Sequence, residues 1–126
     1  MQGAEIVQQV HWGSSKKDLI ALPEDVRRVF GHALHFAQSG EKHDAAKPLK
    51  GFGGAGVLEV VENDEGGTYR AVYTVRYVEV VFVLHCFQKK SKSGIAMPKE
   101  DRAVIETRLK AAAERIKEIR DGKASR

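Results

Sequence analysis

Apolar residues recur at spacings of three and four in two parts of the sequence, a pattern typical of amphipathic helices. The first part follows Pro23, a residue suited to the first turn of a helix, and stops at Gly40, so a helix is predicted over 24–39. A shorter helix is predicted over 14–22, because serines that can cap a helix open this stretch and a proline follows it. The second part predicts a helix over 99–121 with the apolar positions Ile105, Leu109, Ala112, Ile116 and Ile119.

Between these helices the sequence is rich in β-branched residues and alternates at every second position, which indicates strands. Strands are predicted over 57–61, 69–76 and 78–88, with a polar turn between the first two. The turn between the last two, around 77–79, contains no glycine. The segment 41–56 breaks the pattern and is expected to be a glycine-rich loop.

These elements predict an α+β fold in a single domain, residues 1–126, built on a small antiparallel sheet. Two N-terminal helices are expected on one face of the sheet, with a C-terminal helix in addition. Each strand should bury one face against helices and leave the other face open, and the open face is where function is expected.

Alternation along 69–76 assigns its residues to the two faces of the sheet. A hairpin that turns at 64–65 would place Glu59 directly opposite Arg70, where the two charges attract. The residues of this strand predicted on the open face are Arg70, Val72, Thr74 and Arg76.

The composition is that of an ordinary globular protein, since 42% of the 126 residues are hydrophobic and 30% are charged. The formal net charge of +4 is unevenly distributed. Residues 86–126 carry 12 basic and 6 acidic side chains, or +6, and residues 1–85 carry 9 and 11, or −2. A basic part joined to a nearly neutral one favours a polyanionic partner such as nucleic acid.

Cysteine content and apolar run length indicate the compartment. Cys86 is the single cysteine, so the chain has no internal disulfide and no Cys-based zinc site. The apolar runs are shorter than a membrane span needs, and the first residues lack the features of a signal peptide. We therefore expect a cytoplasmic protein in which Cys86 has a structural role.

Two patterns that often indicate cofactors have simpler interpretations here. Residues 51–56 match G-x-G-x-x-G, but a strand is predicted after them, whereas the dinucleotide motif needs a helix there. His32 and His35 lie three positions apart on a predicted helix, but neither has a partner that completes a recognised metal site. No metal and no cofactor are expected.

The strongest local signal is the segment 87–94, in which lysines and an aromatic ring follow a predicted strand. Fixed cations stabilise the charge that develops when a phosphodiester is cleaved, and an aromatic ring can stack on an unpaired base. The alternative is that Phe87 belongs to the core and that the lysines are solvated loop residues. These lysines are Lys89, Lys90 and Lys92.

Several strings resemble the phage-derived, HigB-like branch of the RelE/ParE toxin superfamily, over roughly residues 15–110. The most specific string lies in 83–92 and reads Leu-His-Cys-Phe-Gln-Lys-Lys-Ser. The others are Lys-Pro-Leu-Lys-Gly at 47–51, Val-Leu-Glu at 57–59 and Tyr-Arg-Ala-Val-Tyr at 69–73. The Tyr-Arg start of the string at 69–73 is shared more widely in the superfamily than the string within 83–92.

This resemblance implies a bacterial toxin of a type II toxin-antitoxin system, which a helix-turn-helix antitoxin neutralises. In HigB and RelE relatives the activity is ribosome-dependent, metal-independent cleavage of mRNA. We therefore expect an endoribonuclease, an mRNA interferase that inhibits translation, with the ribosome and mRNA as partners. The 2′-hydroxyl of the RNA would attack the adjacent phosphorus and leave a 2′,3′-cyclic phosphate.

The resemblance also implies roles for individual residues. Arg70 matches the strand arginine that contacts the scissile phosphate. Lys89 and Lys90 match the basic pair after the last central strand, and Lys47 and Lys50 match a basic loop that faces RNA. Further residues expected to hold RNA are Arg76, Phe87 and Lys92.

The C-terminal part departs from the family pattern. RelE-type enzymes often use a C-terminal histidine or tyrosine as a proton carrier, and helix 99–121 is followed by neither. The general base therefore stays open among Tyr73, His85 and a lysine. The helix itself is expected to serve the fold or the antitoxin and not the chemistry, with its apolar seam packed on the sheet or forming an antitoxin-binding groove.

Two alternatives from other classes remain. ParE relatives inhibit gyrase on the same fold, but they usually lack the basic pair found here at 89–90. A non-catalytic RNA-binding module would bind RNA without cutting it.

Overall fold

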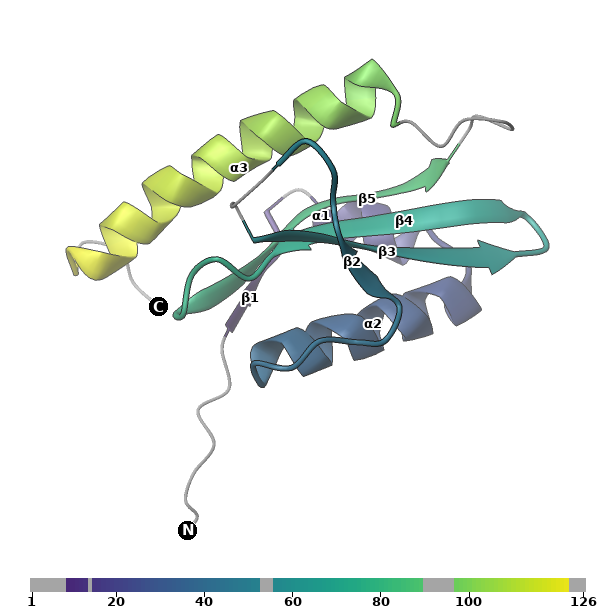
Figure 1. Cartoon of the computed structure of the whole chain (residues 1–126), viewed down its shortest axis with the longest axis horizontal. Coiled ribbons are helices and arrows are strands. Elements are labelled where there is room, and N and C mark those ends of the chain that lie inside the picture. The colour runs from purple at the N-terminus through teal and green to yellow at the C-terminus, as the bar shows by residue number, and fades with distance from the viewer. Residues whose placement is uncertain (1–8, 14, 53–55, 90–96, 123–126) are drawn as a thin grey trace, which may run out of the picture.

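The computed structural model of the chain describes residues 9–13, 15–52, 56–89 and 97–122. Its elements are β1 (Gln9–His11), α1 (Ser15–Ile20), α2 (Glu24–Gln38), β2 (Ala46–Pro48), β3 (Val57–Asp64), β4 (Gly67–Thr74), β5 (Val80–Lys89) and α3 (Lys99–Arg120). The strands form one sheet in the order β1-β5-β4-β3-β2. The predicted α+β class, with two N-terminal helices and a C-terminal one, is confirmed (Figure 1).

The prediction of a purely antiparallel sheet is wrong, because the sheet is mixed. Strands β2 to β5 pair antiparallel, but β1 runs parallel to β5 between Gln9 and His11. Strands β1 and β2 were not predicted, because three residues are too few to show the alternation of apolar and polar positions typical of a strand. Pro48 ends β2, an edge strand, where a missing N–H disturbs the sheet least.

Helices cover both faces of the sheet, so the prediction of one open face is wrong (Figure 1). Helix α2 packs on one face, where Val26, Phe30, Ala33 and Leu34 are buried with Ala71, Tyr73 and Val83. Helix α3 packs on the other, where Ile105, Ala112 and Ile116 are buried with Val72, Phe82 and Leu84. The apolar seam of α3 therefore packs on the sheet, as the first of its two expected roles requires.

The hairpin between β3 and β4 turns one residue later than predicted. Glu65 and Gly66 form the turn, because Asp64 pairs with Gly67, whose φ of +140° favours glycine. The register therefore shifts by two residues, and Arg70 pairs with Val61 instead of Glu59. A shift of two keeps each side chain on its original face, so Glu59 and Arg70 become diagonal neighbours.

The turn between β4 and β5 is held by contacts with distant residues in place of a glycine. The Tyr77 ring is buried and meets the ring of Phe82 edge-on, with centroids 5.8 Å apart. Arg120 near the end of α3 donates to Glu79 at 2.8 Å.

None of the helices in the described ranges combines the length and the hydrophobicity that a membrane span needs.

Candidate nucleic-acid interface and active site

A β-bulge in β5 decides which of its side chains reach the α3 side of the sheet. The register with β4 shifts between Val72 and Tyr73, which leaves Leu84 as the extra residue on β5. An extra residue reverses the alternation of side chains beyond it. The side chains that the bulge turns to the same face as Arg70 are those of His85, Phe87 and Lys89.

A cavity of about 360 Å³ lies where the β2–β3 loop, the sheet and the start of α3 meet. Cationic side chains from three separate segments line it, namely Lys50, Arg70 and Arg102. Among the described residues, Glu59 is the acidic one of the lining, to which Leu49, Gly51 and Met97 also contribute. Because three cations face one carboxylate, the cavity is suited to an anion.

Arg70 is buried, with 7% of its surface exposed, and pairs with Glu59 from the neighbouring strand. Its Nη1 lies 3.3 Å from Glu59 Oε1. The Nε of Arg70 is buried and lacks a hydrogen-bond partner among the described residues. The carboxylate therefore orients the guanidinium from one side, and donors remain for a bound phosphate.

Arg102 fixes the loop wall of the cavity. Its Nη2 donates to the Lys50 carbonyl at 3.4 Å, and its guanidinium carbon lies 4.9 Å from the centroid of the Phe52 ring. Gly51 adopts a φ of +91°, and a Cβ there would collide with the Arg102 guanidinium. The glycine at this position thus permits close approach of an arginine, a use of the 51–56 motif unrelated to dinucleotides.

His85 forms a pair with Asp101 from the first turn of α3. Its Nε2 lies 2.9 Å from Asp101 Oδ1, and its ring stacks on Phe87 with centroids 4.4 Å apart. The Nδ1 of His85 is buried without a hydrogen-bond partner in the described structure. The Asp101 side chain is 25% exposed, so it is the more accessible member of the pair.

The structure does not bring Tyr73 to this site. Its side chain belongs to the core beneath α2, on the opposite face of the sheet from Arg70. Burial raises the pKa of its hydroxyl to about 12, so the phenol stays protonated at neutral pH. Tyr73 lies on the opposite face from Arg70 because side chains alternate along β4 and the two positions are an odd number of residues apart.

Tyr73→Phe should therefore leave toxicity and mRNA cleavage unchanged. The Tyr73 hydroxyl is buried without a hydrogen-bond partner among the described residues. Its removal should keep or raise the free energy of unfolding, by roughly 1 kcal/mol at most. Chemical denaturation and a cleavage assay on the same preparation check both results, and a large loss of cleavage in folded protein would return Tyr73 to the mechanism.

The other basic candidates are only partly gathered at the cavity. Lys47 is exposed on β2 and pairs in register with Glu59, so it shares that face. Lys89 lies on the same face at the end of β5. Arg76 lies apart, with its guanidinium carbon 5.9 Å from the centroid of the Tyr77 ring. The candidates Lys90 and Lys92 lie outside the described residues.

Cys86 has the structural environment expected for it. The thiol is buried in the α2-side core, and burial raises its pKa to about 12. A protonated thiol is a poor nucleophile. His32 and His35 are exposed on α2, on the far side of the sheet from Arg70.

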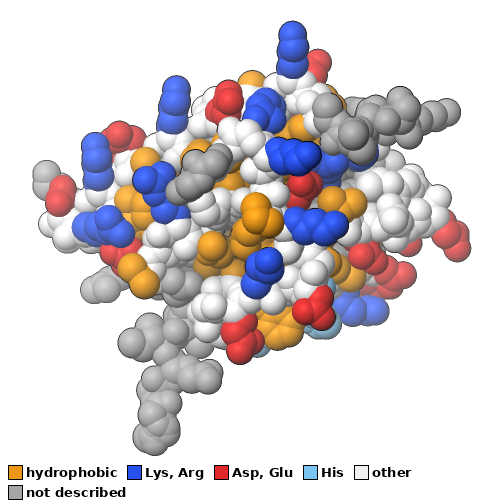
Figure 2. Space-filling model, viewed as in Figure 1, with side chains coloured by type: hydrophobic (Ala, Val, Ile, Leu, Met, Phe, Trp, Pro, Cys, Tyr) orange, Lys and Arg blue, Asp and Glu red, His pale blue; other side chains and the backbone are white. Residues whose placement is uncertain are grey.

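Sequence reasoning missed the contribution of α3 to this site. Asp101 and Arg102 lie in its first turn, where Asp101 contacts His85 of β5 and Arg102 contacts the Lys50 carbonyl of the β2–β3 loop. The helix start at residue 99 was predicted, but only the packing of α3 on the sheet brings its first turn to Arg70. Figure 2 shows Lys and Arg side chains prominent across the α3 side and the middle of the same view.

Comparisons with known proteins place the chain in a family. The family model "Phage derived protein Gp49-like (DUF891)" matches residues 17–110. A search of curated proteins finds no match. Among solved structures, the chain is similar to one from the crystal structure of the toxin-antitoxin complex RelBE2 from Mycobacterium tuberculosis. The two are 21% identical with a TM-score of 0.46, over 70% of this chain and 98% of that one. Because the family model spans most of the sequence, this chain belongs to the phage-derived Gp49-like family of RelE-type toxins, as its sequence motifs indicate.

Proposed function

We propose that this chain cleaves translated mRNA on the ribosome, as the toxin of a two-component toxin-antitoxin system. The observation that carries the proposal is the convergence of Lys50, Arg70 and Arg102 on one cavity. Two of these cations are held in place, Arg70 by the Glu59 carboxylate and Arg102 by a backbone carbonyl. Together with Lys50 they suit a phosphodiester whose negative charge increases during the reaction. The antitoxin is proposed as the protein partner on the basis of family membership.

RNA can approach the cavity from the β3 side of the sheet. Val61, which pairs with Arg70, is 39% exposed on the face that α3 covers elsewhere. Lys47 on β2 and Lys89 on β5 share this face and flank Arg70 on its two sides. A strand of RNA laid across β3 and β4 would therefore meet cations at the centre and at both sides.

The proposed step is an internal transfer within the RNA. The 2′-oxygen forms a bond to the adjacent phosphorus, and the bond from phosphorus to the 5′-oxygen breaks. Arg70 donates hydrogen bonds to the nonbridging oxygens, while Lys50 and Arg102 offset the added charge. The products are a 2′,3′-cyclic phosphate and a 5′-hydroxyl, and the step consumes no cofactor because nucleophile and leaving group both belong to the RNA.

Proton transfer is assigned to the pair of Asp101 and His85. The carboxylate, as the more accessible member, takes the proton of the 2′-hydroxyl, and His85 orients it through the contact to Oδ1. Lys89 and the neighbouring Lys90 are assigned to the 5′-oxygen, which needs a proton as it leaves. This assignment leaves Tyr73 outside the reaction.

Asp101→Asn should lower the cleavage rate about 10²-fold, because the amide cannot accept the proton. His85→Gln should retain more activity than His85→Leu, since only the amide of glutamine can still donate to Asp101. Single-turnover cleavage of ribosome-bound mRNA measures all three variants. Full activity in Asp101→Asn protein would remove the pair from the chemistry.

The reaction itself is tested with purified protein and translating ribosomes. The expected result is cleavage of ribosome-bound mRNA, with upstream fragments that carry a 2′,3′-cyclic phosphate detectable by end-specific ligation. Fragments with a linear 3′-phosphate and no cyclic precursor, or mRNA that is bound and left intact, would contradict the proposed step. The second of these results would favour a binding module.

A further inference from the structure

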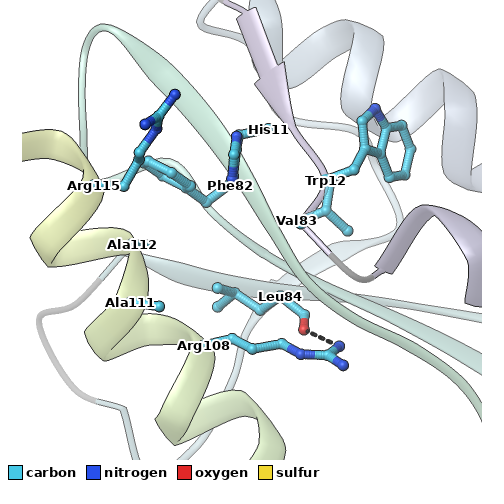
Figure 3. A pocket seen from close by; sticks show the side chains of 10 residues that line it. His11, Trp12, Phe82, Val83, Leu84, Arg108, Ala111, Ala112 and Arg115 are labelled. Carbon is cyan, nitrogen blue, oxygen red and sulfur yellow. Dashed lines mark hydrogen bonds between the residues drawn. The ribbon is translucent and has the colours of Figure 1, made fainter. Parts of the chain in front are cut away.

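The β-bulge in β5 exposes backbone groups that side chains from two helices satisfy. Strand β1 pairs with β5 only as far as Phe82, so the bulge lies beyond the end of β1. Arg108 of α3 donates to the carbonyl of Leu84, the extra residue, at 2.9 Å (Figure 3). Ser15 at the start of α1 is fully buried, and its hydroxyl donates to the Val83 carbonyl at 3.3 Å.

Arg108 also joins these partners to one another. Its Nη1 lies 3.2 Å from the Ser15 hydroxyl, which accepts from it, and 4.0 Å from Asp18 Oδ2. A single guanidinium thus connects α1, α3 and the bulge of β5. An unpaired buried carbonyl is costly, so these contacts stabilise the bulge at this point.

The position of the bulge determines the composition of the proposed active site. Side chains up to Leu84 follow one alternation, and those after it follow the opposite one. If β5 kept its pairing up to Val83 but lost the extra residue, His85 would turn away from Asp101 and from the face that carries Arg70. The same change would remove Lys89 from that face.

We propose that Arg108 is a positioning residue for the cleavage reaction, which it serves by fixing the bulge at Leu84. The catalytic consequence rests on the proposed function, whereas the effect on the strand is independent of it. A displacement of about 1 Å in a catalytic group can cost about 10²-fold in rate. Loss of Arg108 should therefore lower the rate by a similar factor without removing any group that touches RNA.

Arg115 provides a matched control on the same helix. It lines the same cavity as Arg108 beside the bulge, a hollow of about 160 Å³ that also includes His11 and Phe82 (Figure 3). Its guanidinium pairs with Glu118 of its own helix at 3.3 Å. Replacing Arg115 removes the same charge from the same cavity and leaves the contact to Leu84 in place.

The experiment compares Arg108→Met with Arg115→Met in the full chain, by amide hydrogen exchange and by single-turnover cleavage. Arg108→Met should speed exchange on the order of tenfold or more at residues 83–87, with little change at Val60 on β3, which does not pair with β5. Its cleavage rate should fall about 10²-fold, and Arg108→Lys should recover part of both. Arg115→Met should match the unmodified chain.

Uniformly faster exchange throughout the sheet, or local loosening with full cleavage activity, would overturn the proposal. If Arg108→Met does not fold, Ser15→Ala should give the same local exchange pattern at smaller amplitude, and its absence would equally overturn it. Local loosening without any cleavage by the unmodified chain would contradict the proposed function and leave the role of Arg108 in the strand established.

Discussion

Arg70→Ala is expected to lower mRNA cleavage by roughly 10² to 10³-fold, the typical loss when a preorganised donor to a developing charge is removed. Arg70 lines the cavity from β4, the middle strand of the sheet, and lies 3.3 Å from the Glu59 carboxylate that orients it. Lys50 and Arg102 still supply charge, but neither extends from the centre of the sheet. Growth arrest at equal protein abundance and single-turnover cleavage measure the effect.

The same substitution also affects stability, because it leaves the Glu59 carboxylate without its ion-pair partner. Removing one member of a buried pair typically costs about 3–5 kcal/mol, and the Glu59 side chain is only 18% exposed. The double variant Glu59→Gln with Arg70→Ala removes the unpaired charge, so it should regain stability while its cleavage stays as low as that of Arg70→Ala. Glu59→Gln alone should reduce cleavage less.

Arg28→Ala is the matched control, since Arg28 is exposed on α2 and pairs with Glu24 and Asp25 at 3.6 Å. It should leave cleavage unchanged. Undiminished cleavage by folded Arg70→Ala protein would exclude Arg70 from the mechanism. Strictly additive losses for Glu59 and Arg70 would show that the two side chains act independently.

Ending the chain before Glu114 is expected to abolish soluble, folded protein. The truncation removes Ile116, which is 3% exposed in the core beneath α3, and Ile119, which packs against that core. It also removes Arg120, which holds Glu79 in the β4–β5 turn. The loss is on the order of 5 kcal/mol, comparable with the roughly 5–15 kcal/mol that stabilises a whole domain.

Point variants separate packing from partner binding at the same place. Ile116→Ala should lower the free energy of unfolding by about 2–5 kcal/mol, whereas Lys117→Ala, one residue later and exposed, should change it little. Denaturant unfolding measures both. Folded, toxic truncated protein that the antitoxin no longer neutralises would show instead that the last turns of α3 serve the partner.

Local patterns were sufficient to predict the long elements but not the way they pack. The helices over 24–38 and 99–120 are close to their predicted bounds because each has an apolar stripe and a proline before its first turn. The face opposite α2 was predicted to be open because alternation along β4 shows two faces but not what covers each. Val72, for example, was predicted on the open face, whereas the structure buries it fully beneath α3.

In the candidate site, too, some residues could be predicted from the sequence and others depend on how the elements pack. Arg70 and Lys50 were accessible from the sequence through the family resemblance, and Glu59 through the parity of a hairpin. Asp101 and Arg102 were not, because their contacts cross from a helix to a distant strand and loop. The face of the sheet on which the His85 side chain lies depends on the one extra residue, Leu84. The sequence around Leu84 contains no glycine that would indicate a bulge.

Mapping mRNA 5′ ends in cells after induction is the decisive test of mRNA cleavage by this protein, with Arg70→Ala as the paired variant. New 5′-hydroxyl ends are expected within translated regions, in a fixed relation to the reading frame, and they should disappear with Arg70→Ala. Intact messages together with an SOS response would contradict mRNA cleavage and would indicate gyrase as the target.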